Sequence, residues 1–206
     1  MSTTDHFVQS AKTWDSDPLK VARAQAAADA ISRSVPLTPA MRALEYGCGT
    51  GLLSFALHSR IGPVTLADNS TGMLSVLVEK LGACKITDMQ PLKLDLETDP
   101  LPSARFDLIY TLMTLHHIAD TDKILRDLFS LLESPGYLCV ADLDSEDGSF
   151  HGPEFPGHEG FDREDLGQKA KHAGFSRVDF QTVFKMTKSD CPGQREFPVF
   201  LMTARK

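Results

Sequence analysis

The sequence lacks the features that mark secreted, membrane-spanning and nucleic-acid-binding proteins. Lys and Arg number 21 against 28 Asp and Glu, so the formal net charge is -7 and no broad basic face is available for phosphate contacts. No apolar run approaches the ~20 residues that span a bilayer, and residues 1–7 contain no basic segment followed by an apolar core. The four cysteines, at positions 48, 84, 139 and 191, form no Cys-x-x-Cys pair, which favours a reduced protein. We expect a cytoplasmic protein whose partners include neither nucleic acid nor a membrane.

What the sequence does contain is a glycine-rich segment at residues 43–53, Ala-Leu-Glu-Tyr-Gly-Cys-Gly-Thr-Gly-Leu-Leu. A short apolar run carries Glu45 near its end, and glycines follow at positions 47, 49 and 51. Glycine at alternate positions lets the backbone take positive φ and removes Cβ atoms, so a ligand can lie directly against the main chain. The segment predicts a strand, a tight turn and a helix start that together form the floor of a nucleoside site.

The spacing of these glycines argues against a dinucleotide ligand. The fingerprint G-x-G-x-x-G would need its third glycine at position 52, which is Leu52, whereas the glycine stands at 51. Glu45 would repel a pyrophosphate, but it can pair with an ammonium group. A cationic nucleoside fits better, and an NAD-dependent oxidoreductase and a glycine loop that binds nothing remain as alternatives.

Apolar runs that read as strands alternate with helical segments along most of the chain. The expected strands are 43–46, 64–67, 92–94, 106–110, 137–143, 178–186 and 197–204. The expected helices are 17–35, 50–60, 70–82, 121–134 and 162–172. This alternation predicts an α/β, Rossmann-like doubly wound sheet with helices on both faces, and the last two strands, joined by the turn-rich segment 188–196, must pair antiparallel. With 42% apolar residues we expect one domain, in which residues 1–40 form a helical lid and 41–206 the cofactor-binding core.

Acidic residues end three successive predicted strands. Glu45, Asp68 and Asp95 would lie together, because the carboxyl ends of parallel strands meet at one edge of the sheet. Asp68 can accept both ribose hydroxyl hydrogens, although capping the next helix is an alternative role. Asp95 stands where an exocyclic adenine amine needs an acceptor, with a solvated loop acid as the alternative. Met73, on the first turn of the following helix, either touches the adenine face or belongs to the core.

The pattern E-x-G-x-G-x-G at residues 45–51, with the acids that follow it, resembles the cofactor motifs of class I S-adenosylmethionine-dependent methyltransferases. Residues 111–118, Thr-Leu-Met-Thr-Leu-His-His-Ile, are similar to small-molecule methyltransferases of the ubiquinone and menaquinone biosynthesis type. This resemblance implies S-adenosylmethionine as the cofactor. It also implies cofactor contacts from Glu45, Gly47, Cys48, Gly49, Gly51, Asp68, Asn69, Met73, Asp95, Leu96, Thr111, Leu112 and Trp14.

A long polar loop follows the fifth predicted strand, at the edge where α/β enzymes place substrate groups. Residues 142–144, 146–151 and 158–162 resemble a subgroup of bacterial and fungal methyltransferases of largely unassigned substrate, and the resemblance covers nearly the whole chain, including residues 13–15. The candidates in this loop for a base cluster or a metal site are Asp142, Asp144, His151 and His158. They form no compact ligand set and magnesium prefers oxygen ligands, so we expect a solvated or self-bonded loop and no metal.

The resemblance implies direct in-line displacement at the methyl carbon. A sulfonium is an excellent leaving group, so the protein mainly aligns the reactants and excludes water. A general base is needed only for a poorly acidic acceptor, and the candidates are His116, His117 and His151; hydrogen bonding to neighbouring backbone is the alternative role for such loop histidines. Trp14 either closes over the site or packs its helix onto the domain.

The acceptor is expected to be a small molecule, with oxygen, nitrogen, sulfur and carbon all open as the methylated atom. A non-catalytic protein that binds S-adenosylmethionine or S-adenosylhomocysteine is the main functional alternative. Both a monomer and a homodimer are compatible with the sequence.

Overall fold

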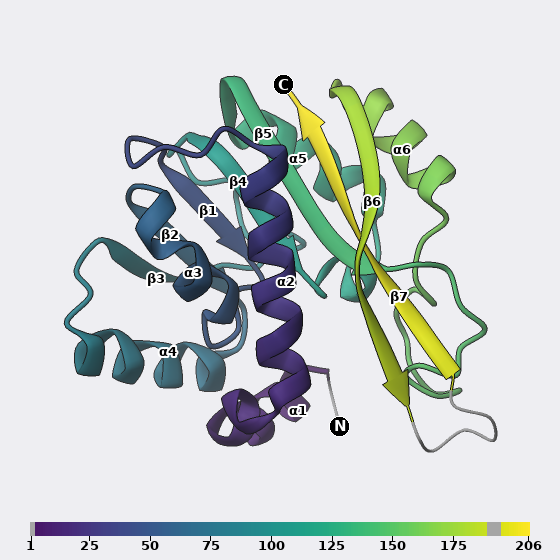
Figure 1. The fold of residues 1–206 in the computed structure, drawn as a ribbon, viewed down its shortest axis with the longest axis horizontal. Helices are drawn as coiled ribbons and strands as arrows, with labels where there is room; N and C mark the ends of the chain where they lie inside the picture. The colour runs from purple at the N-terminus through teal and green to yellow at the C-terminus, as the bar shows by residue number, and fades with distance from the viewer. Residues whose placement is uncertain (1–2, 189–194) are drawn as a thin grey trace.

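The computed structural model describes residues 3–188 and 195–206, in which seven strands form one sheet in the order β3-β2-β1-β4-β5-β7-β6 (Figure 1). The strands are β1 (Ala43–Tyr46), β2 (Val64–Asp68), β3 (Met89–Lys93), β4 (Phe106–Leu112), β5 (Leu132–Leu143), β6 (Ser176–Lys188) and β7 (Arg195–Arg205). The α-helices are α1 (Thr3–Ser10), α2 (Pro18–Ser34), α3 (Leu52–Leu57), α4 (Thr71–Cys84), α5 (Thr121–Leu131) and α6 (Arg163–His172). Short 3-10 helices are η1 (Ala11–Ser16), η2 (His58–Arg60) and η3 (Leu115–His117).

The pairing of the strands confirms the predicted fold class. β1 to β5 run parallel to one another, whereas β7 is antiparallel to both β5 and β6. The chain order reverses between β1 and β4, so the carboxyl ends of these two strands flank the switch point where α/β folds bind ligands. Most of the turn predicted at 188–196 lies outside the described residues.

Side chains of β1 alternate between two apolar layers. Ala43 packs in the layer that contains α2, α3 and α4, and Leu44 packs in the layer that contains α5 and α6. Because both faces of the sheet are covered, β1 is apolar except at Glu45. Leu44 is fully buried, and its replacement by Ala would cost about 2–5 kcal/mol of stability. The strand therefore carries one carboxyl group into the interior, next to the glycine turn.

Side-chain caps fix where the helices around the site begin. Ser70 accepts a hydrogen bond from the backbone of Met73 at the start of α4, and Asp120 accepts one from Lys123 at the start of α5. Asp17 caps α2 and is followed by a proline at the first helical position. The residues that start these helices can therefore be recognised in the sequence, because each cap acts within three residues.

The structure differs from the predicted elements in three places. The helix predicted at 121–134 ends at Leu131 and the chain enters β5 at once, because the residue before Pro135 is disfavoured in a helix. β3 begins at Met89 rather than at 92, since this exposed edge strand carries no alternating apolar pattern. The short helices α1 and η1 were not predicted, as neither has a continuous apolar stripe.

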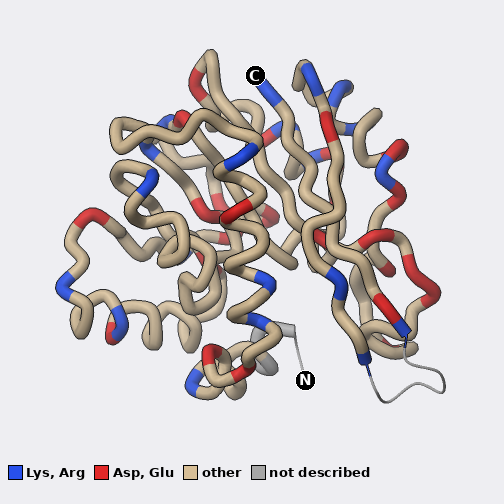
Figure 2. Tube along the Cα trace, viewed as in Figure 1, with Lys and Arg blue, Asp and Glu red and all other residues tan. Residues whose placement is uncertain are grey.

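Charges of both signs are interspersed along the described chain, and acidic residues are dense in the loop between β5 and α6 (Figure 2). Cys48, Cys84 and Cys139 are free thiols, and Cys191 lies outside the described residues. Within the described ranges, no helix combines the length and apolar character that a membrane crossing requires.

Candidate functional site

A cleft of about 1200 Å³ opens at the carboxyl edge of the parallel strands. It is lined by the glycine turn, the ends of β1, β2 and β4, the segment that leads into α2, and the loop after β5. Ligand pockets commonly enclose roughly 300–1,000 Å³, so the cleft has room for a nucleoside and a second molecule. All of the predicted site residues line it except Gly51, Leu96 and Thr111.

The glycine turn places bare backbone on the floor of the cleft. Gly47, Gly49 and Gly51 have φ values of 70°, 53° and 83°, which L-residues with side chains rarely adopt. A Cβ atom on Gly47 would lie 2.8 Å from Cβ of Thr114, whereas one on Gly49 would meet nothing closer than Sδ of Met73 at 4.0 Å. Gly49 therefore leaves open space against the cleft. Gly51 instead packs against α4, since a Cβ there would lie 2.8 Å from Leu77.

Glu45 lies at the bottom of the cleft and is almost fully buried. Its carboxylate accepts hydrogen bonds from the backbone nitrogen of Ser54 at 3.2 Å and from the Ser54 hydroxyl, which contacts the hydroxyl of Tyr110 at 2.6 Å. Burial raises the pKa of Glu45 to about 8, although the hydrogen bonds from Ser54 oppose the shift. A cationic group placed beside this carboxyl would stabilise its ionised form.

Asp68 ties the end of β2 to the glycine turn. One carboxylate oxygen accepts from the backbone nitrogen of Gly49 at 2.7 Å, and the other accepts from that of Ser70 at 2.8 Å. Burial raises the pKa of Asp68, and these backbone donors act in the opposite direction. A carboxylate has about four lone-pair sites, so two donors leave capacity for the hydroxyl groups of a ligand.

Asp95, Met73 and Leu96, which are also predicted to contact the cofactor, lie at different distances from the cleft. Asp95 accepts from the side chain of Asn69 at 3.2 Å and from the backbone of Glu97 at 3.0 Å. Met73 is buried in the core and also borders the cleft, and its contact with an adenine face stays a prediction. Leu96 is fully buried away from the cleft, and its backbone nitrogen donates to the hydroxyl of Tyr46 at 3.1 Å.

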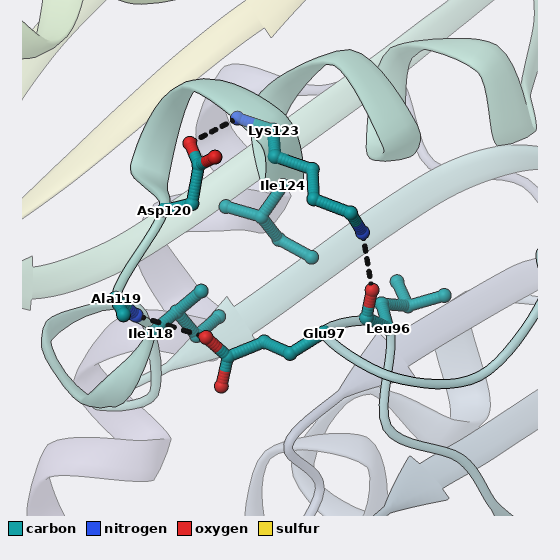
Figure 3. A pocket seen from close by; sticks show the side chains of 7 residues that line it. All are labelled: Leu96, Glu97, Ile118, Ala119, Asp120, Lys123 and Ile124. Carbon is teal, nitrogen blue, oxygen red and sulfur yellow. Dashed lines mark hydrogen bonds between the residues drawn. The ribbon is translucent and has the colours of Figure 1, made fainter.

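A second, smaller hollow of about 90 Å³ lies beside Leu96 (Figure 3). Glu97 accepts a hydrogen bond from the backbone of Ala119 at 3.0 Å, and Lys123 donates to the carbonyl of Leu96 at 2.6 Å. These bonds join the loop after β3 to the start of α5. The hollow is far below the volume of a nucleoside pocket, and its contacts hold the rim of the main cleft.

The opposite part of the cleft contains a buried histidine–aspartate pair. Nδ1 of His116 lies 2.6 Å from a carboxylate oxygen of Asp142, and the backbone nitrogen of His116 donates to the other oxygen at 3.3 Å. Both side chains are essentially inaccessible. Burial alone raises the pKa of Asp142, but the neighbouring His116 outweighs it and holds that pKa below its ordinary value. Asp142 thus orients the ring of His116.

Two further histidines gather around His116. The ring centroid of His117 lies 4.2 Å away and that of His151 4.9 Å away, and His151 stacks on Phe155 at 3.9 Å. Although the edge of His151 is open to the cleft, burial lowers its pKa to about 4, helped by the nearby charges of His116 and Lys188. The sequence singled out the three histidines separately, and the fold brings them together.

Two other candidates from the polar loop, Asp144 and His158, do not line the cleft and have structural partners. Asp144 forms two 2.6 Å contacts with Arg163 at the start of α6. The backbone of His158 donates to the carbonyl of His116 at 2.8 Å, and its ring lies 2.9 Å from the carbonyl of Ile118. The loop is held by its own hydrogen bonds, as one of the two sequence-based expectations had it.

Sequence reasoning missed a cation in the cleft. Arg23 projects from α2, and its guanidinium contacts Sδ of Met186 at 2.9 Å. Its Nε is buried and has no hydrogen-bond partner among the described residues. Burial lowers the pKa of Arg23, and Asp142 and Asp17 oppose that shift. In the sequence Arg23 reads as an ordinary polar position of an amphipathic helix, so no local signal marked it.

The N-terminal segment is fastened to the glycine turn by Asp15. Its carboxylate accepts from the hydroxyl of Thr50 and from Nζ of Lys80, and Lys80 also donates to the carbonyl of Thr50 at 2.7 Å. The neighbouring Trp14 lines the cleft, with Nζ of Lys20 lying 4.1 Å from its ring centroid. The contact network therefore holds Trp14 at the cleft wall.

Comparison with known proteins gives consistent matches. A family model described as a methyltransferase domain matches residues 37–174. The chain is 32% identical over 152 residues to an uncharacterized methyltransferase of Schizosaccharomyces pombe, covering 70% of this chain and 52% of that protein. It is 37% identical over 110 residues to the ubiquinone/menaquinone biosynthesis C-methyltransferase of Vibrio vulnificus, covering 51% of this chain and 42% of that protein.

The fold also matches solved structures. A SAM-dependent methyltransferase from Aquifex aeolicus superposes with a TM-score of 0.71 at 22% identity, covering 96% of this chain and 97% of that one. The chain spans about half the length of the two curated relatives named above.

Proposed function

Because the chain belongs to the methyltransferase-domain family, we propose that it uses S-adenosylmethionine as its cofactor and transfers a methyl group to a small-molecule acceptor by direct in-line displacement. The observation that carries this proposal is the division of one cleft into two parts: backbone glycines and strand-end acids at one, and a histidine cluster with a partly buried arginine at the other. The first part suits a cationic nucleoside. The second suits an acceptor that must lose a proton.

At the cofactor end, each group has a chemical reason to bind S-adenosylmethionine. Asp68 is proposed to accept the ribose hydroxyls, and the open backbone at Gly49 to let the nucleoside lie close. Glu45 would face the ammonium group, which would compensate the burial of the carboxylate. Asn69 and Asp95 would meet the adenine edge. The cofactor supplies a methyl group on a sulfonium, and these residues hold that methyl in line with the acceptor.

At the acceptor end, the histidines are proposed to receive the acceptor's proton. Nδ1 of His116 is engaged by Asp142, which leaves Nε2 as the ring nitrogen for an acceptor. His117 and His151 flank that ring within the same wall of the cleft. As the acceptor atom forms its bond to the methyl carbon, the carbon–sulfur bond breaks and neutral S-adenosylhomocysteine leaves.

The acceptor is further proposed to carry an anionic group. Arg23 lines the cleft with a partly buried side chain, and its buried Nε has no hydrogen-bond partner among the described residues. A buried donor without a partner costs about 1–3 kcal/mol, more when the group is charged. A carboxylate or phosphate on the acceptor would satisfy this donor with the planar geometry that guanidinium prefers.

Methyl transfer from radiolabelled S-adenosylmethionine to a metabolite extract tests this function. We expect label in a small-molecule product that is retained on an anion-exchange resin, and reduced labelling with the Asp68→Ala variant at cofactor concentrations below saturation. Arg23→Gln should reduce labelling of the retained product while leaving the affinity for S-adenosylhomocysteine unchanged. Tight binding of S-adenosylhomocysteine without any labelled product would overturn the catalytic proposal and favour the non-catalytic binding role.

A further inference from the structure

The three histidines of the acceptor end are close enough to share one ligand. His116 and His117 are adjacent in η3 after β4, and His151 comes from the loop after β5. One ring nitrogen from each lies within 4.8 Å of the corresponding nitrogen of the other two. The fold therefore points three imidazoles at a common small volume, a feature that no local motif in the sequence encodes.

Asp142 supplies the support that a metal-binding histidine ordinarily has. Histidines that ligate metals almost always donate their second ring N–H to a carboxylate, carbonyl or water, which fixes the tautomer and the ring orientation. Here Nδ1 of His116 lies 2.6 Å from Asp142, which is itself fully buried and also accepts from the backbone of Leu143 at 2.8 Å. The ring of His116 is thereby held with Nε2 as its ligating atom.

Aromatic side chains wall the cluster on several sides. Phe155 stacks on His151 with an interplanar angle of 13°, and Phe7 meets the ring of His117 edge-on at 5.4 Å. Phe150 contacts His151 at 4.6 Å. These neighbours limit the rotation of the rings and exclude water, so the imidazoles are partly organised before any ligand arrives.

We propose that His116, His117 and His151 bind one divalent transition-metal ion, zinc or a neighbouring first-row metal, with a fourth position open toward the cleft. Imidazole nitrogens suit zinc, copper, iron and nickel, whereas magnesium prefers oxygen ligands. With Zn–N bonds of about 2.0–2.1 Å in a tetrahedral site, the three nitrogens would be about 3.3 Å apart. A contraction from 4.8 Å requires small ring movements, which the cleft-exposed His151 can supply.

The nearby charges indicate what occupies the fourth position. Arg23 and Lys188 add positive charge near the cluster, and Asp142 is the buried negative charge beside it. An anionic oxygen ligand would balance this surplus. Resting on the proposed function, the inference assigns that oxygen to the acceptor: a bound metal lowers the pKa of a coordinated hydroxyl, as it lowers that of coordinated water to about 7. With their ring nitrogens on the metal, the histidines no longer serve as the base. The coordinated hydroxyl therefore releases its proton to solvent, its oxygen bonds to the methyl carbon, and the carbon–sulfur bond breaks to release S-adenosylhomocysteine.

This inference replaces the sequence-based expectation of no metal. That expectation concerned Asp142, Asp144, His151 and His158 of the polar loop, which form no compact ligand set, and the preference of magnesium for oxygen ligands. His158 turned out to hold the backbone of His116, and two histidines from a different loop joined His151 instead.

Metal titration of the chelator-treated full chain tests the site without acceptor or cofactor. We expect one equivalent of Zn²⁺ by calorimetry, and one equivalent of Co²⁺ with the strong visible absorption of a tetrahedral ion. His117→Ala and His151→Ala should each weaken binding by about 100-fold, at the top of the 10–100-fold range known for loss of a supporting partner. His172→Ala, on the exposed end of α6, is the matched control and should bind as the parent chain does.

The outcomes separate this inference from the proposed function. Unchanged metal affinity in both His117→Ala and His151→Ala, or no binding at micromolar metal, overturns the metal site. Affinity for S-adenosylhomocysteine reports the cofactor end and the folded state of each variant, and it should not change. If methyl transfer to an extract persists in the presence of a chelator, the metal inference fails while the methyltransferase proposal stands.

Discussion

The carboxylate of Asp68 accepts a hydrogen bond from the backbone nitrogen of Gly49 at 2.7 Å, which fixes the end of β2 to the turn after β1. Gly49 and Asp68 are 19 residues apart in the chain, and this hydrogen bond joins them directly. Because that contact lies on the cleft floor, a change at Asp68 alters both the ligand's partner and the position of the turn.

Replacement of Asp68 by Ala is expected to weaken the binding of S-adenosylhomocysteine by roughly 5- to 150-fold. The loss of hydrogen bonds to the ribose hydroxyls accounts for about 1–3 kcal/mol. Isothermal titration calorimetry measures the effect, and Asp88→Ala, an exposed acid at the opposite edge of the sheet, is the control. An unchanged dissociation constant would remove Asp68 from the proposed cofactor site.

Alanine at Gly47 and at Gly49 should have different consequences. Both positions have positive φ, so each substitution costs about 1–3 kcal/mol of backbone strain. At Gly47 the new Cβ also collides with Thr114, which adds about 1–3 kcal/mol of overpacking. Gly47→Ala should therefore lower the melting temperature more than Gly49→Ala does. Gly49→Ala should instead act mainly on cofactor affinity, because its methyl group occupies open cleft space.

These two variants are compared by thermal unfolding in the absence and presence of S-adenosylhomocysteine. The expected pattern is a large loss of stability for Gly47→Ala, and a smaller loss with little ligand-induced stabilisation for Gly49→Ala. Equal melting temperatures for the two unliganded variants would contradict the assigned collision with Thr114.

Much of this arrangement was predictable from short stretches of sequence, because it depends on local chemistry. Short sequence patterns predict several local features of the site. They are the turn at the alternate glycines, the acids Asp68 and Asp95 at strand ends, and the helix cap at Ser70. The strand alternation then fixes which ends share an edge. The same pattern predicts that the last two strands pair antiparallel, whereas the place of β7 between β5 and β6 does not follow from it.

What could not be predicted depends on side chains that meet only after folding. Arg23 reaches the cleft from α2, and its guanidinium contacts Sδ of Met186 in β6. His151 joins His116 because the loop after β5 folds back over η3. No periodicity or spacing in the sequence predicts either contact, because each joins elements that are distant in the chain.

The raised pKa of Glu45 gives stability a defined dependence on pH. The folded-state pKa is about 8 against an ordinary 4.5, so the folded chain holds this proton more tightly than the unfolded chain does. The contribution of Glu45 to stability is therefore fully present below pH 4.5 and is lost as pH rises through 8. Glu45→Gln should flatten this part of the profile, measured as the free energy of unfolding in urea between pH 5 and pH 8.5.

The raised pKa of Glu45 also leads us to expect proton release when the cofactor binds. At pH 7 Glu45 is mostly protonated, and an ammonium group beside it favours the ionised form, so binding should expel up to one proton. Calorimetry in buffers of different ionisation enthalpy measures that proton. Its persistence in Glu45→Gln would show that another group titrates on binding.

The Asp15 network predicts that the N-terminal segment contributes to cofactor retention. Asp15 holds Thr50 of the glycine turn and Lys80 of α4, and the adjacent Trp14 borders the cleft. Asp15→Asn should raise the dissociation constant for S-adenosylhomocysteine by about 2- to 12-fold, which corresponds to about 0.5–1.5 kcal/mol for one weakened contact. The effect should appear mainly in the dissociation rate, because the segment closes over a ligand that is already bound.

Lys12→Ala, on the exposed side of the same segment, is the control and should leave both rates unchanged. A double-mutant cycle with Thr50→Val then isolates the contact. If Asp15 acts through Thr50, the two substitutions are less than additive, because each removes the same hydrogen bond. Full additivity would mean that Asp15 influences the cofactor through Lys80 and not through the hydroxyl of Thr50.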